Sequence, residues 1–130
     1  MRILIAEDDA TSRKFLFKLL SKYGECDMVV DGIEVVEAFE IAHDIGQPYD
    51  LICLDIMMPK IDGIKALKAI RDFERNKGIE KERRCKVIFT SALDETEAGF
   101  DALRTGNEIY ITKPIDIDKF MDVLNQLLGI

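Results

Sequence analysis

Short apolar runs alternate along the chain with longer stretches in which apolar residues recur every three or four positions. The runs are predicted strands, and they cover residues 2–6, 26–30, 51–54, 87–89 and 109–111. The stretches between them have the periodicity of amphipathic helices and are centred on residues 15–20, 33–42, 64–73, 94–103 and 120–128. Strict alternation of five strands with five helices favours right-handed crossovers. We therefore predict an α/β fold, a doubly wound parallel sheet covered by helices on both faces.

The third run ends more sharply than the others. Leu51 to Leu54 is apolar on both faces, as expected of a strand in the middle of a parallel sheet, and Asp55 is the first residue to leave it. Pro59 cannot continue a sheet ladder, and Asp62-Gly63 is typical of a turn before a helix. Open α/β sheets bind their ligands beyond the carboxyl ends of the strands. Asp55 is therefore the first candidate site residue.

Three other predicted strands end on residues that could join Asp55. Asp8 and Asp9 follow the first strand, Thr90 follows the fourth, and Lys113 follows the fifth. The carboxyl ends of parallel strands lie at the same edge of the sheet, so these side chains are expected to lie close together. Taken singly, each could be a helix cap or a surface ion pair, but the four strand ends together indicate a site.

Carboxylates that are brought together repel one another unless a cation compensates them. Asp8, Asp9 and Asp55 offer hard oxygen ligands, and Mg²⁺ suits few carboxylates because it keeps water and phosphate oxygens as its other ligands. Metals that prefer thiolate or imidazole are excluded, since no cysteine is placed there and His43, the only histidine, ends the second predicted helix. The predicted cofactor is Mg²⁺.

Carboxylates, Mg²⁺, a hydroxyl and a lysine are together the groups needed to accept a phosphoryl group. One aspartate can attack phosphorus covalently. The metal and Lys113 would stabilise charge on the transferred oxygens, and the Thr90 hydroxyl could hold one of them afterwards.

Length and composition limit the alternatives. The 130 residues suit a single domain, and with 48% hydrophobic and 33% charged residues they are typical of a globular protein. No apolar run is long enough to span a bilayer, and the start lacks a signal peptide, so we expect a cytoplasmic protein without a membrane partner. Three cysteines without a CxxC pair are expected to be reduced.

Charge is distributed unevenly along the chain. The net charge of −7 opposes binding to nucleic acid. Residues 60–86 nevertheless carry 10 basic and 5 acidic side chains, whereas residues 87–130 carry 3 and 8. The basic segment is either a solvated helix face and loop or a docking patch.

The motifs at the strand ends resemble those of the receiver domain of two-component response regulators, and the resemblance covers residues 1–130. The matching motifs are Glu7-Asp8-Asp9, Leu54-Asp55-Ile56-Met57-Met58-Pro59 with Asp62-Gly63, Thr90-Ser91-Ala92 and Lys113-Pro114. The resemblance implies the CheY-like, flavodoxin-like strand order 2-1-3-4-5. It also implies a stand-alone regulator in which Asp55 accepts a phosphoryl group from a sensor histidine kinase or a histidine phosphotransfer protein. Such a domain is not an enzyme beyond its own phosphorylation and dephosphorylation.

The resemblance also assigns roles to individual residues. Asp9, Asp55 and the main-chain carbonyl of Met57 would hold Mg²⁺, with Asp8 acting through water. Thr90 and Lys113 would bind the phosphoryl oxygens, Tyr110 would be the switch aromatic together with Thr90, and the Lys113-Pro114 bond would be cis. The fourth helix, fifth strand and fifth helix would then bind a downstream protein partner. The segment from Lys77 to Lys86 is longer than is usual in the family.

Other functions fit less well. A phosphatase of the haloacid dehalogenase type needs an acid two residues after its aspartate, where Met57 stands. A flavodoxin-like carrier needs a phosphate-binding loop after the first strand, and a kinase or GTPase needs a GxxxxGK[ST] loop, which is absent. The alternative that stays open is a receiver fold that binds proteins without being phosphorylated. The sequence does not identify the kinase, the output partner or the oligomeric state.

Overall fold

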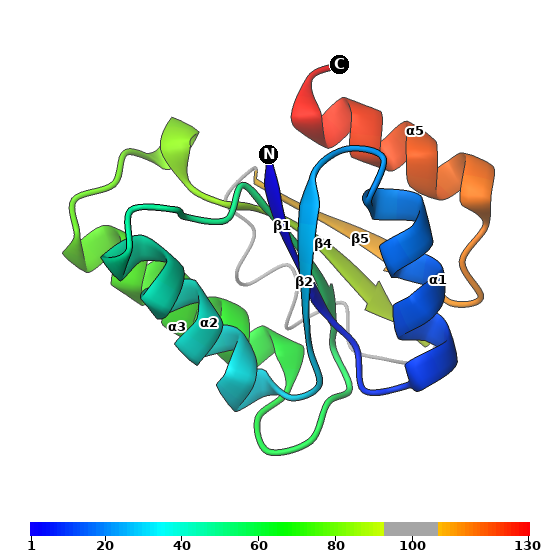
Figure 1. Cartoon of the computed structure of the whole chain (residues 1–130), viewed down its shortest axis with the longest axis horizontal. Coiled ribbons are helices and arrows are strands. Elements are labelled where there is room, and N and C mark those ends of the chain that lie inside the picture. Colours follow the sequence, from blue (N-terminus) through cyan, green and yellow to red (C-terminus); the bar gives the residue numbers. More distant parts are fainter. Residues whose placement is uncertain (93–106) are drawn as a thin grey trace.

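The fold is a five-stranded parallel sheet between two layers of helices, seen here in a computed structural model that describes residues 1–92 and 107–130 (Figure 1). The strands are β1 (Arg2–Ala6), β2 (Glu25–Val29), β3 (Leu51–Asp55), β4 (Lys86–Ser91) and β5 (Glu108–Thr112). The helices are α1 (Ala10–Leu20), α2 (Gly32–Asp44), α3 (Gly63–Asn76), the 3₁₀ turn η1 (Lys81–Arg83) and α5 (Ile117–Leu128). The strand order is β2-β1-β3-β4-β5, all parallel, which confirms the predicted order.

The observed elements differ from the predicted ones mainly at their ends. β3 includes Asp55, because Asp55 still pairs in register with Thr90 of β4. The turn η1 was not predicted, since the charged segment around it has no apolar periodicity. The helix predicted near residues 94–106 lies outside the described residues. Within the described residues, no helix is long and apolar enough to cross a membrane.

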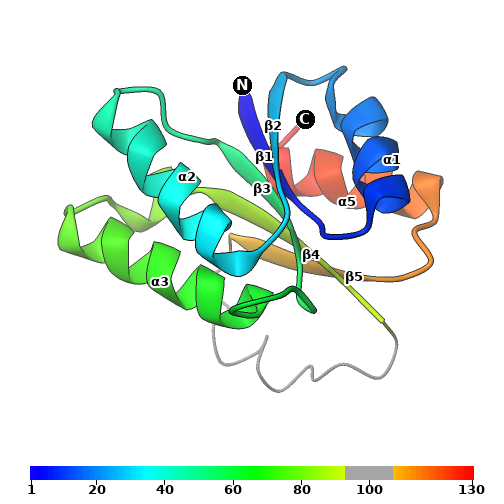
Figure 2. The ribbon, with the colours of Figure 1, turned by 60° about the horizontal axis from the view of Figure 1, so that its bottom comes forward.

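Each face of the sheet is covered by its own pair of helices. α1 and α5 lie on one face and α2 and α3 on the other, as Figures 1 and 2 both show. On the α1 and α5 face, Leu16 and Phe120 pack against the strand residues of alternate positions. On the other face, Phe39 and Leu67 pack against the remaining positions. Every strand except β2 therefore buries side chains on both of its faces, as its nearly continuous apolar sequence indicates.

An aspartate begins each of the four α-helices in the described part of the chain. Asp9, Asp31, Asp62 and Asp116 each accept a hydrogen bond from the backbone N–H three residues further on. Such N-caps satisfy an amide that would otherwise lack a partner in the first turn. All four helices begin close to the carboxyl edge of the sheet, so these caps help to fix the loops around the candidate site.

Candidate functional site

Strand register brings the predicted site residues to one side of the sheet. Asp55 and Thr90 are direct partners across β3 and β4. Both continue the alternation of residues that face α1 and α5, because Cys53 and Ile88, two positions earlier, belong to that core. Asp55 is buried, with 4% of its surface exposed, and Thr90 is fully buried.

Lys113 reaches this pair from the end of β5. Its backbone N–H donates to the Ser91 carbonyl at 2.6 Å, which places it beside the end of β4. Its Nζ lies 3.2 Å from Asp55 Oδ2 and 3.1 Å from Glu7 Oε2. The Lys113-Pro114 bond is cis, which confirms that prediction. The structure thus brings Asp55, Thr90 and Lys113 together as predicted.

The acidic cluster differs from the predicted one by one residue. Carboxylate oxygens of Glu7, Asp8 and Asp55 lie within 4.8 Å of one another, and this group does not include Asp9. Instead, Asp9 Oδ2 accepts the Ser12 N–H at 2.8 Å and caps α1. That hydrogen bond lowers the pKa of Asp9. The structure therefore groups Glu7 and Asp8 with Asp55 and places Asp9, predicted as a magnesium ligand, at the N-cap of α1.

Glu7 is the residue that the sequence prediction missed. It is almost fully buried, and its Oε1 accepts the Asp9 N–H at 3.1 Å while its Oε2 pairs with Lys113. The strand alternation contained the signal, because Glu7 lies two positions after Ile5, which faces the α1 and α5 core. Asp8 is exposed, and its carboxylate lies within 4.8 Å of those of Glu7 and Asp55.

The pKa values of Asp55 and Lys113 depend on each other and on Glu7. Burial raises the pKa of Asp55 to about 7, and the neighbouring Glu7 carboxylate adds to this, while Lys113 opposes it. Burial disfavours the charged form of Lys113, but its hydrogen bond to Glu7 and the charge of Asp55 outweigh this and raise its pKa. Two buried carboxylates therefore share one lysine, which leaves the site short of positive charge.

The remaining site residues differ in their surroundings. The Thr90 hydroxyl is buried and has no hydrogen-bond partner among the described residues. The Met57 N–H donates to Asp55 Oδ1 at 3.3 Å, while 63% of Met57 is exposed. Tyr110 is half-buried on β5 and packs against the core on the α2 and α3 face. An unpaired buried hydroxyl is uncommon and points to a missing ligand group.

Gly63 packs against the backbone of Asp55 so closely that no side chain would fit there. A Cβ added to Gly63 would lie 2.4 Å from the Asp55 carbonyl oxygen, and the Gly63 N–H donates to the Ile56 carbonyl at 2.8 Å. Lys60, in the same loop, has a φ of 71°, in the left-handed region, and its Nζ lies 3.4 Å from Asp31 Oδ2. The predicted Asp62-Gly63 turn thus packs the loop closely under the site.

The fold and this edge of the sheet define the class of protein. The family described as "Response regulator receiver domain" matches residues 3–125, and the chain belongs to that family. A chemotaxis protein CheY of Treponema pallidum is 33% identical over 98% of this chain and 82% of its own length.

Solved structures agree with the sequence comparison. A CheX–CheY complex with BeF₃ and Mg²⁺ from Borrelia burgdorferi has 28% identity and a TM-score of 0.76, covering 98% of this chain and 89% of that one. The receiver domain of a response regulator bound to its histidine phosphotransfer protein, from Saccharomyces cerevisiae, has 26% identity and a TM-score of 0.78. The alignment covers 98% of this chain and 88% of the yeast receiver chain.

Proposed function

We propose that this chain is a receiver whose Asp55 accepts a phosphoryl group from a histidine of a sensor kinase or phosphotransfer protein. A carboxylate oxygen of Asp55 forms a bond to phosphorus while the bond between phosphorus and the imidazole nitrogen breaks. The observation that carries the proposal is the position of Asp55, buried at a strand end and 3.2 Å from the Lys113 ammonium. The yeast complex of a receiver with a phosphotransfer protein supports this choice of donor.

Lys113 and Thr90 would bind the oxygens of the transferred group. The Lys113 ammonium already lies between two carboxylates and can donate to a phosphoryl oxygen attached to Asp55. The buried Thr90 hydroxyl, which lacks a partner in the described part of the chain, would donate to a second oxygen. The new hydrogen bond would draw Thr90 toward the phosphoryl group and let Tyr110 turn inward behind it.

The acidic cluster fits Mg²⁺. Glu7, Asp8 and Asp55 supply hard oxygen donors within 4.8 Å of one another, and burial followed by the Glu7 carboxylate raises the pKa of Asp55. Asp8, Asp55 and the Met57 main-chain carbonyl would hold the ion, with Glu7 assisting. When bound, Mg²⁺ supplies charge neutralisation for the incoming phosphoryl oxygens.

The output surface would include β5 and α5. Residues 87–130 carry 3 basic and 8 acidic side chains, so a basic or mixed-charge protein partner fits this face better than DNA. The predicted fourth helix, which would complete the surface, lies outside the described residues. The chain would act on no other substrate, since its chemistry is limited to gaining and losing the phosphoryl group on Asp55.

Small phosphoryl donors test the proposal directly. Incubation with Mg²⁺ and acetyl phosphate, or with phosphoramidate, whose bond from phosphorus to nitrogen resembles that of phosphohistidine, should add one phosphoryl group by intact mass. Asp55→Asn should show no gain. Asp50→Asn, at the opposite end of β3, is the matched control and should be labelled normally. Full labelling of Asp55→Asn would overturn the assignment, and no labelling of the native protein would favour the unphosphorylated protein-binding module.

A further inference from the structure

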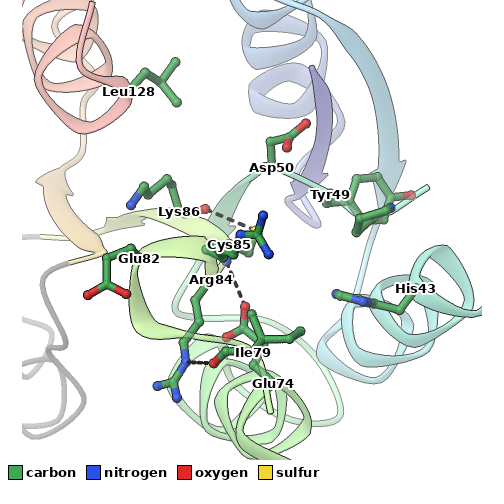
Figure 3. A pocket seen from close by; sticks show the side chains of 12 residues that line it. His43, Tyr49, Asp50, Glu74, Ile79, Glu82, Arg84, Cys85, Lys86 and Leu128 are labelled. Carbon is green, nitrogen blue, oxygen red and sulfur yellow. Dashed lines mark hydrogen bonds between the residues drawn. The ribbon is translucent and has the colours of Figure 1, made fainter. Parts of the chain in front are cut away.

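A hollow lies at the edge of the sheet opposite to Asp55. It has a volume of about 460 Å³ and is bordered by the starts of β3 and β4, the ends of α2 and α5, and the segment from Ile79 to Lys86. Figure 3 shows His43 and Tyr49 along one side of it and Glu82 and Lys86 along the other. Its volume is in the range typical of small-molecule sites, about 300–1,000 Å³.

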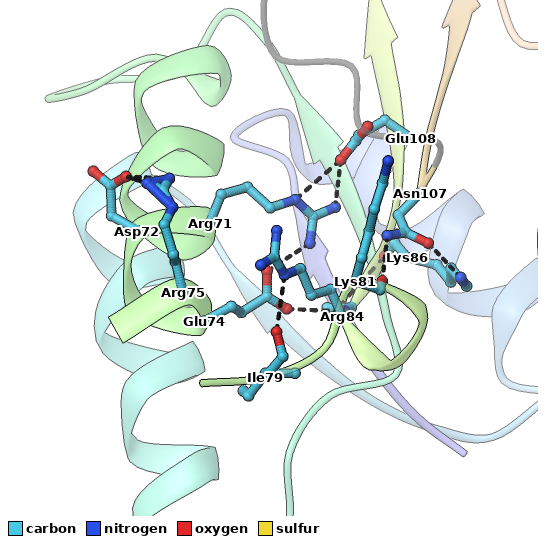
Figure 4. Close-up of polar contacts among 11 residues, drawn as sticks. Arg71, Asp72, Glu74, Arg75, Ile79, Lys81, Arg84, Lys86, Asn107 and Glu108 are labelled. Atoms are coloured by element: carbon cyan, nitrogen blue, oxygen red, sulfur yellow. Dashed lines mark hydrogen bonds and ion pairs between the residues drawn. The ribbon is translucent and has the colours of Figure 1, made fainter. Parts of the chain in front are cut away.

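A buried ionic network, drawn in Figure 4, contributes Glu74 to the lining of the hollow. Arg71 pairs with Glu108 at 2.6 Å and with Glu74 at 2.7 Å, and all three side chains are buried. The other Glu74 oxygen accepts the Cys85 N–H at 2.8 Å. Both oxygens of Glu74 therefore have donors before any ligand binds, and Arg71 divides its charge between Glu74 and Glu108.

The segment from Ile79 to Lys86 is also anchored on the side that faces β5. Asn107, just before β5, donates from Nδ2 to the Lys81 carbonyl at 2.8 Å, and its Oδ1 accepts from Lys86 Nζ. The Lys86 N–H donates to the Asp50 carbonyl at 3.0 Å. The segment is therefore held between α3, β3 and β5, so its backbone needs little ordering when a ligand binds.

Two guanidinium groups on this anchored segment are available. Arg84 donates its Nε–H to the Ile79 carbonyl at 3.2 Å, which orients the group and leaves its Nη donors. Among the described residues, neither Arg83 nor Arg84 forms an ion pair with a carboxylate. The lining holds three basic side chains, Arg83, Arg84 and Lys86, and three carboxylates, Asp50, Glu74 and Glu82, of which Glu74 is paired with Arg71. The hollow thus presents two guanidinium groups that no carboxylate of the described residues pairs with, in a protein of net charge −7.

From this arrangement we propose that the hollow is a binding site for a small polyvalent anion, with Arg83 and Arg84 as its recognition residues. Paired guanidinium groups bind phosphate or carboxylate oxygens through several charge-assisted hydrogen bonds. The apolar lining from Pro48, Ile79 and Leu128 would contact the body of the ligand. Both phosphorylated and polycarboxylate ligands have the required chemistry.

Titration with two probes in metal-free buffer tests this site separately from Asp55. Without a cation, the carboxylates of Glu7, Asp8 and Asp55 repel anions, so an anion should perturb only the hollow lined by Arg83 and Arg84. Inorganic pyrophosphate and citrate are added in separate titrations, with sodium chloride at equal ionic strength as the reference. Amide NMR signals of Arg84 and Cys85 should shift and saturate. Saturation by pyrophosphate alone identifies a phosphorylated ligand, and saturation by citrate alone a polycarboxylate.

Matched variants separate specific binding from general attraction to positive charge. Arg83→Gln and Arg84→Gln should each weaken binding by about tenfold or more, as expected for the loss of a charge-assisted hydrogen bond. Arg75→Gln removes the same charge from an exposed position on α3 outside the pocket and should leave the affinity unchanged. The proposal is overturned if neither probe gives saturable shifts, or if Arg75→Gln weakens binding as much as the other two variants.

Discussion

Lys113 Nζ lies 3.2 Å from Asp55 Oδ2, and the same ammonium lies 3.1 Å from Glu7 Oε2. One cation thus serves two buried carboxylates whose strands lie side by side. The pKa of Asp55 reflects the result, because burial and Glu7 together outweigh the lysine and raise it to about 7. A second cation at this place would complete the balance of charge, which agrees with the proposed Mg²⁺ site.

Replacing Lys113 should alter both the titration of Asp55 and its reactivity. In Lys113→Gln the pKa of Asp55 should rise above its native value, because the ammonium that opposes the shift is lost. Labelling by acetyl phosphate should slow by about tenfold or more. Carbon-13 NMR of the carboxyl group measures the pKa, and Lys119→Gln, exposed on α5, is the control. A lowered or unchanged pKa of Asp55 would show that Lys113 does not set it.

Asp55 should make the metal-free protein less stable as pH rises. The folded protein holds the Asp55 proton with a pKa of about 7, against an ordinary value of 3.8, so between these values the folded state binds more protons than the unfolded state. The free energy of unfolding therefore falls from about pH 4 to about pH 7 and then levels off.

Asp55→Asn removes this cost of burying charge. The variant should be more stable than the native protein by roughly 2 kcal/mol at pH 8, and the difference should nearly vanish at pH 4. Urea denaturation at the two pH values measures it, with Asp122→Asn on the exposed side of α5 as the control. A variant that is less stable at pH 8 would contradict the pKa of Asp55.

Asp8 and Asp9 should prove to have different roles. Asp8→Ala should weaken Mg²⁺ binding by about tenfold or more, since it removes a ligand of the acidic cluster. Asp9→Ala should keep most of the Mg²⁺ affinity and lower the free energy of unfolding by about 1 kcal/mol, because α1 loses its N-cap. Calorimetry with Mg²⁺ and urea denaturation separate the two effects. The opposite pattern would restore Asp9 as the ligand.

The sequence predicted the fold well because each strand is short and apolar and ends on a polar residue. Asp55, Thr90 and Lys113 were predicted together because parallel strands must end at one edge, and the structure places them there. Glu7 was missed because three acidic residues in a row do not show which of them faces inward. That becomes clear only when the alternation along β1 is continued from Ile5, which faces the α1 and α5 core, to Glu7.

The basic segment could not be resolved from sequence for a different reason. Its charges have no periodicity, and the contacts that hold it join residues far apart in the chain, such as Arg71 to Glu108 and Glu74 to Cys85. Arg71 and Glu74 occur on α3 among exposed charges of the same types, Asp72 and Arg75. Nothing in their identity shows that they are buried, so the ionic network appears only in the folded chain.

Arg71 should be important for stability. Arg71→Met leaves Glu74 and Glu108 buried without their guanidinium partner, and the loss should be about 3–5 kcal/mol. Arg75→Met removes an exposed pair with Asp72 and should cost less than about 1 kcal/mol. Urea denaturation compares the two variants. Similar small losses from both would mean that the network contributes little to the folded state.

The lifetime of the phosphoryl group should depend on the two side chains that flank Asp55 and Thr90, namely Met57 and Ala92. Both are exposed at this edge of the sheet, and neither can hydrogen-bond a water molecule in line with the bond from Asp55 to phosphorus. Bulky Met57 should also exclude water, so we expect slow loss of the group. A polar side chain at either position could orient the attacking water, so Met57→Asn and Ala92→Glu should speed the loss by about tenfold or more.

Intact mass followed over time after removal of the donor measures the rate, and Met57→Leu, which is apolar and of similar size, should match the native protein. If neither polar substitution accelerates the loss, water is not controlled by these two side chains, and the lifetime must be set by the groups that bind the phosphoryl oxygens, Lys113 and Thr90.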